Sequence, residues 1–550
     1  QNKPMYIFDK QGYIYSYEVQ NIDSIVFDRI DPRLNIVPQK AIVYKGNPRR
    51  VEIQNIAFPT YHYVNNVTWT VGNDSVVTIS ETTPSSYSLA ACDVTGLRMG
   101  TTTLTATVNV TEYSNNNYST NEYQATVEIE VRPMQISEWL NDENLDNYLS
   151  YASPYEDIKY LHDHWGYFGF SELTTDEAVV PTRIGGDWDD NGFWRNIHNH
   201  TNYSEHTKNL YQQLTKGISA CEQMIENLTY SSVSDAKKQP LILEYTVLRD
   251  YYGYLMLDCF GSFCWQDEKE YIDNSLGTLH SAPVIWSKLV DDLESNVEKL
   301  PVVTDANRSQ YVGKVTQGFA YSLLARLYLN AESFGCTSQN IQLSATTISA
   351  VSDFYTQAIR CCDKVISSGS YTIEDDYFTN FKIRNEQSRE NIFVIVEDGS
   401  TSNWRQEYFP MSNKARLQLL TLPYAMQTAW NLIEQPWNGL SATESFIKRF
   451  EYGKDLRGLC DTLQGTDAYS GHGWFAGPVK KDGTIVKDYT ENVIITPRIT
   501  SITNAGRNEG ARMIKYEPDL TGTYQFMEND FVLFRYADVL YMKAEAVLRG

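Results

Sequence analysis

A loop at residues 183–195 gathers the residue types that could hold a sugar ring. Its sequence, RIGGDWDDNGFWR, interleaves two tryptophans with carboxylate and guanidinium groups, and two adjacent glycines free its backbone. A pyranose has an apolar C–H face and a polar edge, which suit a flat indole ring and planar bidentate groups. The candidate ligand-binding residues in this loop are Arg183, Asp187, Trp188, Asp190 and Trp194.

These candidates have structural alternatives. Trp188 or Trp194 could fill the core beneath the loop, because large aromatic side chains supply much of the apolar area in any core. Arg183 could tie the loop down through an aspartate instead of meeting a ligand. The sequence leaves both readings open.

A second aromatic turn lies at residues 434–439, with the sequence EQPWNG. Pro436 and Gly439 favour a turn around Trp437 and Asn438, and residues of a turn are often exposed. A turn tryptophan that buries itself fits the sequence equally well. We add Trp437 and Asn438 to the candidates. Two weaker candidates come from the aromatic stretch before this turn: Trp404 and Tyr408.

Patterns that would indicate catalysis are weak. The acids of 187–190 are neighbours on one loop, whereas a glycosidase needs two carboxyls about 5 to 9 Å apart across the scissile bond. The pairs His162/His164 and His198/His200 have the alternate spacing of metal ligands on a strand, but no third ligand accompanies either pair. The chain has no nucleophile elbow, phosphate loop or dinucleotide fingerprint. We therefore expect no enzyme activity, no metal and no cofactor.

Composition limits the class of partner. At 550 residues the chain is too long for one ordinary core, so it should fold as several domains. It carries 46 Lys and Arg against 69 Asp and Glu, and this formal charge of -23 disfavours nucleic acid and anionic membrane surfaces. The 39 tyrosines and 11 tryptophans suit sugar binding, although large cores also use them. The eight cysteines form no C-x-x-C pair, and we expect them to be small core residues.

The first 133 residues are rich in strand patterns. Two short runs around a Gly-containing turn predict a β-hairpin within residues 1–35. Five alternating segments between 36 and 133 predict a β-sandwich, with Trp69 as a buried core residue. The order of the Val-Thr-Trp, Val-Thr-Ile and Val-Thr-Gly-Leu segments resembles the bacterial Ig-like domain, a module that usually acts as a spacer.

From residue 134 the pattern becomes helical. Apolar residues recur at three-and-four spacing in six segments, with small residues where helices could cross, as in tetratricopeptide-type helix pairs. The last helix carries such a stripe at Ala537, Leu540, Ala544 and Leu548. Residues 370–530 are loop-rich and aromatic, which is where a scaffold tends to keep its binding surface. The six helical segments are 205–228, 238–259, 283–300, 313–332, 354–367 and 535–549.

Five blocks resemble, in order, motifs of the SusD/RagB-like nutrient-binding proteins. The last block, FVLFRYADVLYMKAEA, resembles the family's C-terminal signature, and LRDYYGYLMLDCFG resembles its tyrosine-rich helix. The chain has Ser262 where the family usually has proline, and it ends soon after the signature where the family continues. The resemblance thus implies a SusD/RagB-like domain at 134–550 that lacks a C-terminal helical tail. The five blocks are 173–188, 248–261, 314–330, 387–393 and 531–546.

The family's properties imply a function. Its members capture oligosaccharides at the cell surface and pass them to a SusC-like TonB-dependent β-barrel transporter in the outer membrane. The resemblance implies the same ligand, partner and location here, with the membrane reached only through a lipid anchor upstream of this chain. Two alternatives stay open: a surface glycosidase or peptidase, and a peptide-binding receptor of the same build.

Overall fold

The structure is a computed structural model that describes residues 4–8, 14–18 and 34–550, with some positions inside the last range left out. The chain forms two compact units, one within residues 1–135 and one made of 136–265 and 278–550. We call them the N-terminal unit and the body. The positions left out are 39, 46, 56–60, 86–87, 115–116, 133–138, 202–203, 266–276, 345, 398–419, 433–434, 451–453, 456, 461–462, 465–472 and 519–527.

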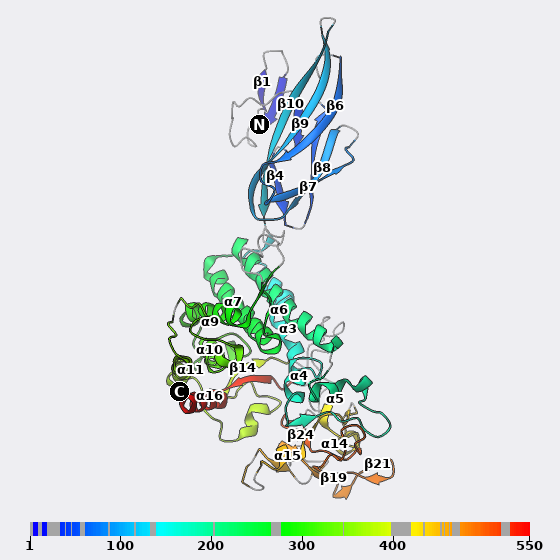
Figure 1. The fold of residues 1–550 in the computed structure, drawn as a ribbon, viewed down its shortest axis with the longest axis vertical. Coiled ribbons are helices and arrows are strands. Elements are labelled where there is room, and N and C mark those ends of the chain that lie inside the picture. Colours follow the sequence, from blue (N-terminus) through cyan, green and yellow to red (C-terminus); the bar gives the residue numbers. More distant parts are fainter. Residues whose placement is uncertain are drawn as a thin grey trace. The chain divides into compact units, whose positions relative to one another are not determined.

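The N-terminal unit consists of strands. The predicted hairpin is present as β1 (Pro4–Phe8) paired antiparallel with β2 (Ile14–Glu18). Eight further strands form two four-stranded sheets, ordered β4-β10-β9-β6 and β3-β5-β8-β7 (Figure 1). These strands are β3 (Leu34–Val37), β4 (Lys40–Tyr44), β5 (Arg49–Asn55), β6 (Tyr61–Val71), β7 (Val77–Thr82), β8 (Ser88–Gly96), β9 (Gly100–Ser114) and β10 (Asn117–Arg132).

One apolar core joins the two sheets. It includes Ile53 and Val94 from one sheet and Val108 and Ile129 from the other, all fully buried. Inward and outward residues alternate along β10, as expected for a sheet with one wet face. Trp69 packs against this core but is only partly buried, so it is less buried than predicted. It lies on β6, the strand at the end of its sheet. The Ig-like assignment stays a prediction.

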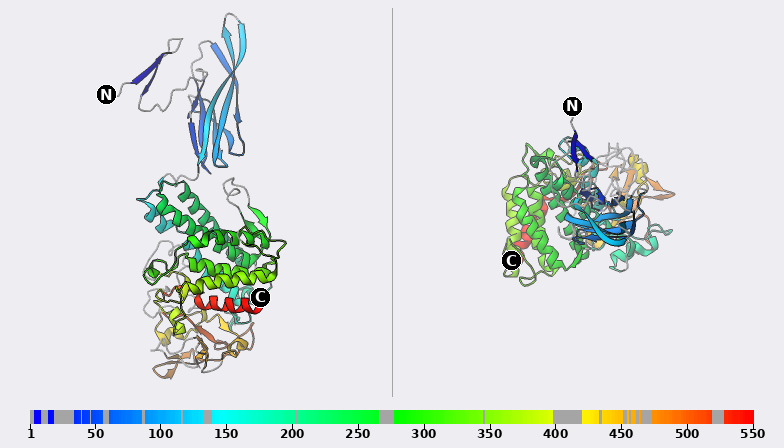
Figure 2. Two further views of the ribbon diagram at one scale, coloured as in Figure 1. Left: turned by 90° about the vertical axis from the view of Figure 1, so that its left-hand side faces the viewer. Right: turned by 90° about the horizontal axis from the view of Figure 1, so that it is seen from above.

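The body is built on the six predicted helices. Neighbours in sequence pack on one another: α6 on α7, α7 on α9, α9 on α10, and α10 on α11, which in turn contacts α16. Figures 1 and 2 show α9, α10, α11 and α16 in successive layers. Whether these are tetratricopeptide-type pairs stays a prediction. The helices are α6 (Ser204–Tyr230), α7 (Asp235–Phe260), α9 (Ala282–Asn296), α10 (Gln317–Leu329), α11 (Val351–Ser367) and α16 (Tyr536–Arg549).

An aromatic cluster joins these helices to a two-stranded sheet. Strand β14 (Asn391–Ile395) pairs antiparallel with β25 (Phe531–Arg535), the extended entry to the last helix. Phe393 from β14 stacks on Phe319 of α10, with ring centroids 4.1 Å apart, and Phe534 from β25 meets Phe319 edge-on at 5.3 Å. Offset and edge-on pairs of this kind stabilise beyond the area they bury. The extended start of the C-terminal signature therefore packs against the helical scaffold.

The stripe predicted on the last helix is mostly exposed, and a neighbouring face of the helix is buried. The buried residues of α16 are Val539, Met542 and Ala546, whereas Leu540 and Leu548 are 37% and 87% exposed. Both stripes have helical spacing, so periodicity alone does not choose between adjacent faces. The helices α10 and α11 determine which face of α16 is buried, because α16 packs against them.

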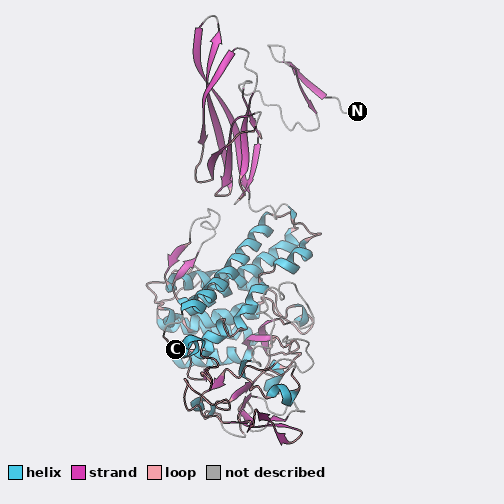
Figure 3. Ribbon diagram, turned by 90° about the vertical axis from the view of Figure 1, so that its right-hand side faces the viewer, coloured by secondary structure: helices cyan, strands magenta, loops and turns pink. Residues whose placement is uncertain are grey.

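Short strands and helices make up the remainder of the body. Figure 3 shows most of the strands gathered at one end, beyond the helical layers. Across the part of the chain that the structure describes, no helix is long and apolar enough to cross a membrane. The short helices are α2 (Leu145–Ala152), α3 (Tyr155–Ile158), α4 (Tyr167–Leu173), α5 (Phe193–His198), α14 (Met426–Trp430) and α15 (Glu444–Ile447). The short strands are β11 (Ala178–Val179), β12 (Phe263–Trp265), β13 (Thr278–His280), β15 (Ser441–Ala442), β16 (Leu459–Cys460), β17 (Leu463–Gln464), β18 (Gly473–Phe475), β19 (Gly477–Lys481), β20 (Thr484–Ile485), β21 (Lys487–Asp488), β22 (Glu491–Asn492), β23 (Ile494–Ile495) and β24 (Arg512–Ile514).

Two buried carboxyls lie where β14 ends and β25 begins. The Asp530 carboxylate accepts a hydrogen bond from the Glu397 backbone N–H at 2.9 Å, and the Asp530 N–H donates to Asn385 Oδ1 at 2.8 Å. Burial raises the pKa of Asp530 to about 7, and burial raises the pKa of Glu397 well above its ordinary value. The folded protein thus binds a proton at Asp530 more tightly than the unfolded chain does.

We expect Asp530→Asn to stabilise the protein at high pH. Ionised Asp530 destabilises the fold above pH 7, and that cost disappears as the pH falls from 7 towards 4. At about 1.4 kcal/mol per pKa unit, the substitution should raise the free energy of unfolding by up to about 4 kcal/mol at pH 8 and by little near pH 4.5. Urea denaturation followed by tryptophan fluorescence measures this for the body, which holds every tryptophan except Trp69.

The exposed Asp375→Asn is the matched control, and it should change stability little at either pH. A pH-independent effect of Asp530→Asn would contradict the assigned titration.

Candidate functional site

The loop at 183–192 has an unusual backbone. Its glycines turn it with φ of +91° at Gly185 and +84° at Gly186, and Trp188, Asp190 and Asn191 also have positive φ, at +62°, +40° and +53°. Side-chain-bearing residues rarely adopt this region, and they persist there only where the surroundings hold them. The loop is therefore held in shape by contacts from outside it.

Arg183 supplies those contacts. Its side chain is 1% exposed, and all five of its N–H groups donate hydrogen bonds within the protein. Four go to backbone carbonyls on two distant segments, and the fifth goes to the Ser441 hydroxyl. Arg183 thus has no donor left for a ligand and joins three loops. The four carbonyls belong to Asn438, Gly439, Gly506 and Glu509.

A second buried arginine lies beside the first. Arg512 is fully buried and donates to Ser441 Oγ, to Asn438 Oδ1 at 2.8 Å and to the carbonyl of Arg507 at 2.9 Å. Burial lowers the pKa of Arg183 to about 10 and lowers that of Arg512 well below its ordinary value, and in Arg512 the neighbouring Arg183 charge adds to the effect. We call the buried hydrogen-bonded cluster of Arg183, Arg512, Asn438 and Ser441 the clasp. The Asn438 side chain is 1% exposed and bonds through both its oxygen and its nitrogen, so it belongs to the clasp and does not face solvent.

The two tryptophans of the loop have different surroundings. Trp194 is 1% exposed, stacks on His164 with centroids 5.7 Å apart, and lies 4.7 Å from the Trp165 ring. Trp188 is half-buried and meets Trp194 edge-on at 5.4 Å. Trp194 is therefore a core residue, whereas part of the Trp188 surface is exposed to solvent.

Trp188 also joins the two aromatic segments predicted from the sequence. Its Nε1 donates to the carbonyl of Trp437 at 2.7 Å, and the Trp437 ring is half-buried in the same cluster. A Cβ added at Gly439 would lie 2.7 Å from the Trp188 ring, so only glycine permits this close approach. The structure thus brings together the loops around 188 and 437.

The acidic residues of the loop are exposed. Asp187 accepts a hydrogen bond from the Tyr424 hydroxyl, and Asp190 accepts one from Trp194 Nε1. Burial, followed by the nearby Asp187 carboxylate, raises the pKa of Tyr424, so its hydroxyl stays protonated at neutral pH. Asp187 keeps free acceptor capacity because a carboxylate has two oxygens.

An exposed tyrosine nearby was missed by the sequence reasoning. Tyr489 lies between β21 and β22, is 82% exposed, and has a φ of +54°. The Arg507 guanidinium carbon is 4.6 Å from the centroid of its ring, and Arg507 Nη1 is 3.4 Å from Asp488 Oδ2. The backbone carbonyl of Arg507 accepts from both Asn438 and Arg512, which links Tyr489 to the clasp. The sequence did contain a signal for this exposed tyrosine, because Tyr489 lies within the polar segment KDYTEN at 487–492.

We call the exposed and partly exposed residues around the clasp the aromatic face. Figure 1 shows α5, α14, β21 and β24 at the same end of the body. Trp404 and Tyr408 lie outside the described residues, so their place relative to this face stays a prediction. The aromatic face consists of Asp187, Trp188, Tyr424, Tyr489 and Arg507.

The described residues contain no group of three or more His, Cys, Asp or Glu side chains placed to hold a metal ion. Of the paired histidines, His162 lies 3.2 Å from the buried Glu397 carboxylate, and His164 belongs to the tryptophan cluster. His198 and His200 contact the carbonyls of Leu173 and Thr174. These contacts position the histidines within the fold.

Comparison with known proteins identifies the fold. Residues 389–549 match the model of the SusD family, and no curated protein matches the chain. Surface glycan-binding protein A from Bacteroides thetaiotaomicron, solved with laminarihexaose, has 18% identity and a TM-score of 0.54 over 75% of this chain and 79% of that one. The protein of the same name from Bacteroides uniformis has 16% identity and a TM-score of 0.53, over 74% of this chain and 76% of that one. A SusD superfamily protein from Parabacteroides distasonis has 14% identity and a TM-score of 0.51, over 73% of this chain and 76% of that one. The C-terminal segment thus matches the SusD family, and the greater part of the chain shares the fold of these solved proteins.

Proposed function

We propose that this protein binds oligosaccharides on its aromatic face. The observation that carries the proposal is the Tyr489 ring, which is exposed on one side and backed by the Arg507 guanidinium on the other. A flat ring held rigidly at the surface loses little entropy when a sugar stacks on it. Two solved proteins of similar fold are described by their ligands, laminarihexaose and laminarin, which supports the class of ligand.

The polar groups of the face suit the edge of a sugar ring. Asp187 can accept hydrogen bonds from hydroxyls, while Arg507 and the Tyr424 hydroxyl can donate. Trp188, half-buried beside Trp437, offers a second apolar surface. Stacking supplies most of the affinity in such a site, and the polar groups supply orientation.

We further propose that the protein works at the cell surface of its bacterium and delivers its ligand to a SusC-like TonB-dependent transporter. In that arrangement a lipid anchor upstream of this chain holds the protein at the outer membrane. Tethering raises the effective concentration of ligand near the transporter, so even weak capture is useful. Co-purification of the barrel protein with this chain from outer membranes tests the partnership.

Binding without hydrolysis separates this proposal from the enzyme alternative. The aromatic face as defined contains a single carboxylate, Asp187, and the neighbouring Asp488 is paired with Arg507, whereas a glycosidase needs two carboxyls across the scissile bond. Purified protein incubated with a panel of polysaccharides should release no reducing sugar. Release would favour the glycosidase alternative.

Tyr489→Ala should weaken glycan binding without destabilising the protein. Loss of an aromatic anchor should lower affinity about tenfold or more, and a side chain that is 82% exposed contributes little to folding. Affinity gels with laminarin and other polysaccharides, with melting temperatures alongside, measure both effects. Tyr541→Ala, a 68% exposed tyrosine on α16, is the matched control. Equal retardation of Tyr489→Ala and the unmodified protein in every gel would refute the assignment of the ring.

Arg183→Met should impair both stability and binding. The substitution removes five hydrogen bonds, and although the Ser441 hydroxyl and the Glu509 carbonyl keep their bonds from Arg512, the loss should cost at least about 3 kcal/mol in the free energy of unfolding. Loss of the clasp should also release the loops that carry Trp188 and Arg507. Urea denaturation and affinity gels at a temperature where the variant stays folded measure the two effects.

Arg195→Met in the same loop is the control. The Arg195 guanidinium makes a 3.5 Å ion pair with Asp189 at the surface, so its loss should cost less than about 1 kcal/mol. Similar losses in the two variants would argue against a special role for Arg183.

A further inference from the structure

Three tyrosine rings are exposed on one face of the N-terminal unit, outside the segment that matches the SusD family. They belong to Tyr63 on β6, Tyr113 on β9 and Tyr118 on β10, which are 54%, 37% and 68% exposed. In the strand register Tyr113 lies opposite Tyr118, and Tyr63 lies opposite Thr111. Because side chains alternate between the two faces of a strand, the three rings project from the same face of the sheet. We call them the tyrosine cluster.

Packing alone does not account for the exposure of these rings. Tyr123, on the inward face of β10, is a packed tyrosine: it is 6% exposed, and its hydroxyl donates to Glu112 at 2.5 Å. The cluster lies on the opposite face, turned away from the core of the N-terminal unit. The Tyr113 and Tyr118 rings pair with centroids 4.9 Å apart, and such a cross-strand pair stabilises a ribbon. That pair still leaves most of Tyr118 in water, and most of Tyr63 is in water too.

The residues beside the cluster are polar and uncharged. Thr111 Oγ1 accepts a hydrogen bond from Asn65 Nδ2 at 2.9 Å and lies 3.1 Å from Thr120 Oγ1. Of the residues described on this face of β6, β9 and β10, the charged one nearest to the rings along the strands is Glu122, which pairs with Asn109. In a chain with 21% charged residues, the cluster is therefore a neutral patch.

Such a surface suits an uncharged ligand that is rich in hydroxyls. Exposed rings offer apolar area for stacking, while threonine and asparagine side chains can both donate and accept hydrogen bonds. An ionic ligand would find no counter-ion at the rings, so it would gain no charge-assisted contact there. A pyranose has an apolar C–H face and a hydroxyl edge, and a neutral polysaccharide repeats both along its length.

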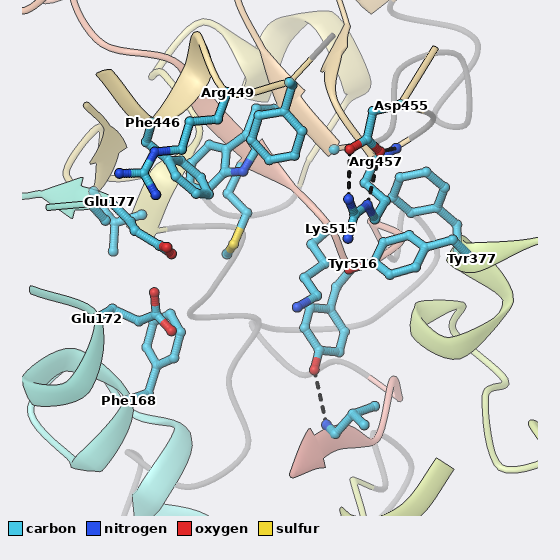
Figure 4. Close-up of a pocket in the computed structure, with 18 of the residues that line it drawn as sticks. Phe168, Glu172, Glu177, Tyr377, Phe446, Arg449, Asp455, Arg457, Lys515 and Tyr516 are labelled. Carbon is cyan, nitrogen blue, oxygen red and sulfur yellow. Dashed lines mark hydrogen bonds and ion pairs between the residues drawn. The ribbon is translucent and has the colours of Figure 1, made fainter. Parts of the chain in front are cut away.

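The large cavity of the body has a different character. It has a volume of about 520 Å³ and opens between α4, α15, β18 and the segment that follows β24 (Figure 4). Six charged side chains line it, three of each sign, and two of them, Asp455 and Arg457, pair with each other at 2.7 and 2.9 Å. Its charges therefore favour no single class of ligand, in contrast to the tyrosine cluster. The six are Glu172, Glu177, Arg449, Asp455, Arg457 and Lys515.

We propose that the tyrosine cluster is a second binding site for a neutral polysaccharide, so that the N-terminal unit itself binds ligand. Sugar rings stack on Tyr118 and Tyr63, and the side chains of Thr111 and Asn65 bond to their hydroxyls. The site shares no residue with the aromatic face, and it does not rest on the function proposed for that face. Two sites on one chain raise the avidity for a polymer long enough to reach both.

Native affinity gels of the full chain test the proposal, with laminarin, xyloglucan, galactomannan or starch in the gel. Tyr489→Ala first removes the exposed ring of the aromatic face. We expect this variant to remain retarded in at least one gel, and its affinity there to fall about tenfold or more when Tyr63→Ala and Tyr118→Ala are added, because the stacking surfaces are lost. Gln124→Ala, an exposed residue further along the same face of β10, is the matched control. Polygalacturonate in the gel should cause no retardation that depends on the two tyrosines.

The outcomes separate the two sites. If Tyr489→Ala abolishes retardation in every gel, or if the remaining retardation is indifferent to Tyr63→Ala and Tyr118→Ala, the proposal for the tyrosine cluster is overturned and the aromatic face stands. Retardation that needs the two tyrosines but not Tyr489 would support the cluster and refute the aromatic face. Absence of retardation of the unmodified protein in every gel would refute both.

Two further measurements exclude other roles for the rings. The melting temperature should change little in the double variant because the replaced rings are exposed, and a large drop that parallels the loss of retardation would mark them as structural instead. Sedimentation velocity should show the same oligomeric state with and without Tyr63→Ala and Tyr118→Ala. Oligomers that dissociate in the double variant would assign the cluster to a contact between copies of this chain.

Discussion

The burial of Arg183 is the constraint on which the end of the body that carries the aromatic face depends. A guanidinium group without solvent must satisfy every donor within the protein, and here four backbone carbonyls and one hydroxyl do so. Those acceptors come from segments more than 250 positions away in sequence. A planar fork with five donors can hold several loops at once, which an ammonium group with three donors could not do equally well.

Much of the surface geometry follows from that clasp. Positive φ angles at Trp188, Asp190 and Asn438 are unfavourable for residues with side chains, and the contacts around Arg183 and Arg512 hold these residues in place. The same contacts fix the backbone of Arg507, whose guanidinium group supports the Tyr489 ring. The aromatic face is therefore preorganised although it lies on loops.

The scaffold was the more predictable part. All six helical segments predicted from periodicity are present, and the hairpin and the strand-rich N-terminal region are present too. At α16, two adjacent stripes have helical spacing, and the neighbouring helices bury Val539, Met542 and Ala546. Trp69 packs against the core of the N-terminal unit but is only partly buried. In both cases the degree of burial depends on segments that lie far away in the sequence.

The sequence by itself determined the helical scaffold, the strand-rich leading region, the SusD/RagB-like resemblance and the two aromatic segments around residues 188 and 437. These depend on local spacing, which the chain states directly. Only the tertiary structure decided which of those residues face solvent. It placed Trp194, Asn438 and Arg183 inside and left Trp188 half-exposed, and it added Tyr489 and Arg507 from more than 40 positions beyond the second segment. The physical reason is that exposure depends on what distant segments cover, and here the hydrogen-bond requirements of two buried arginines bring those segments together.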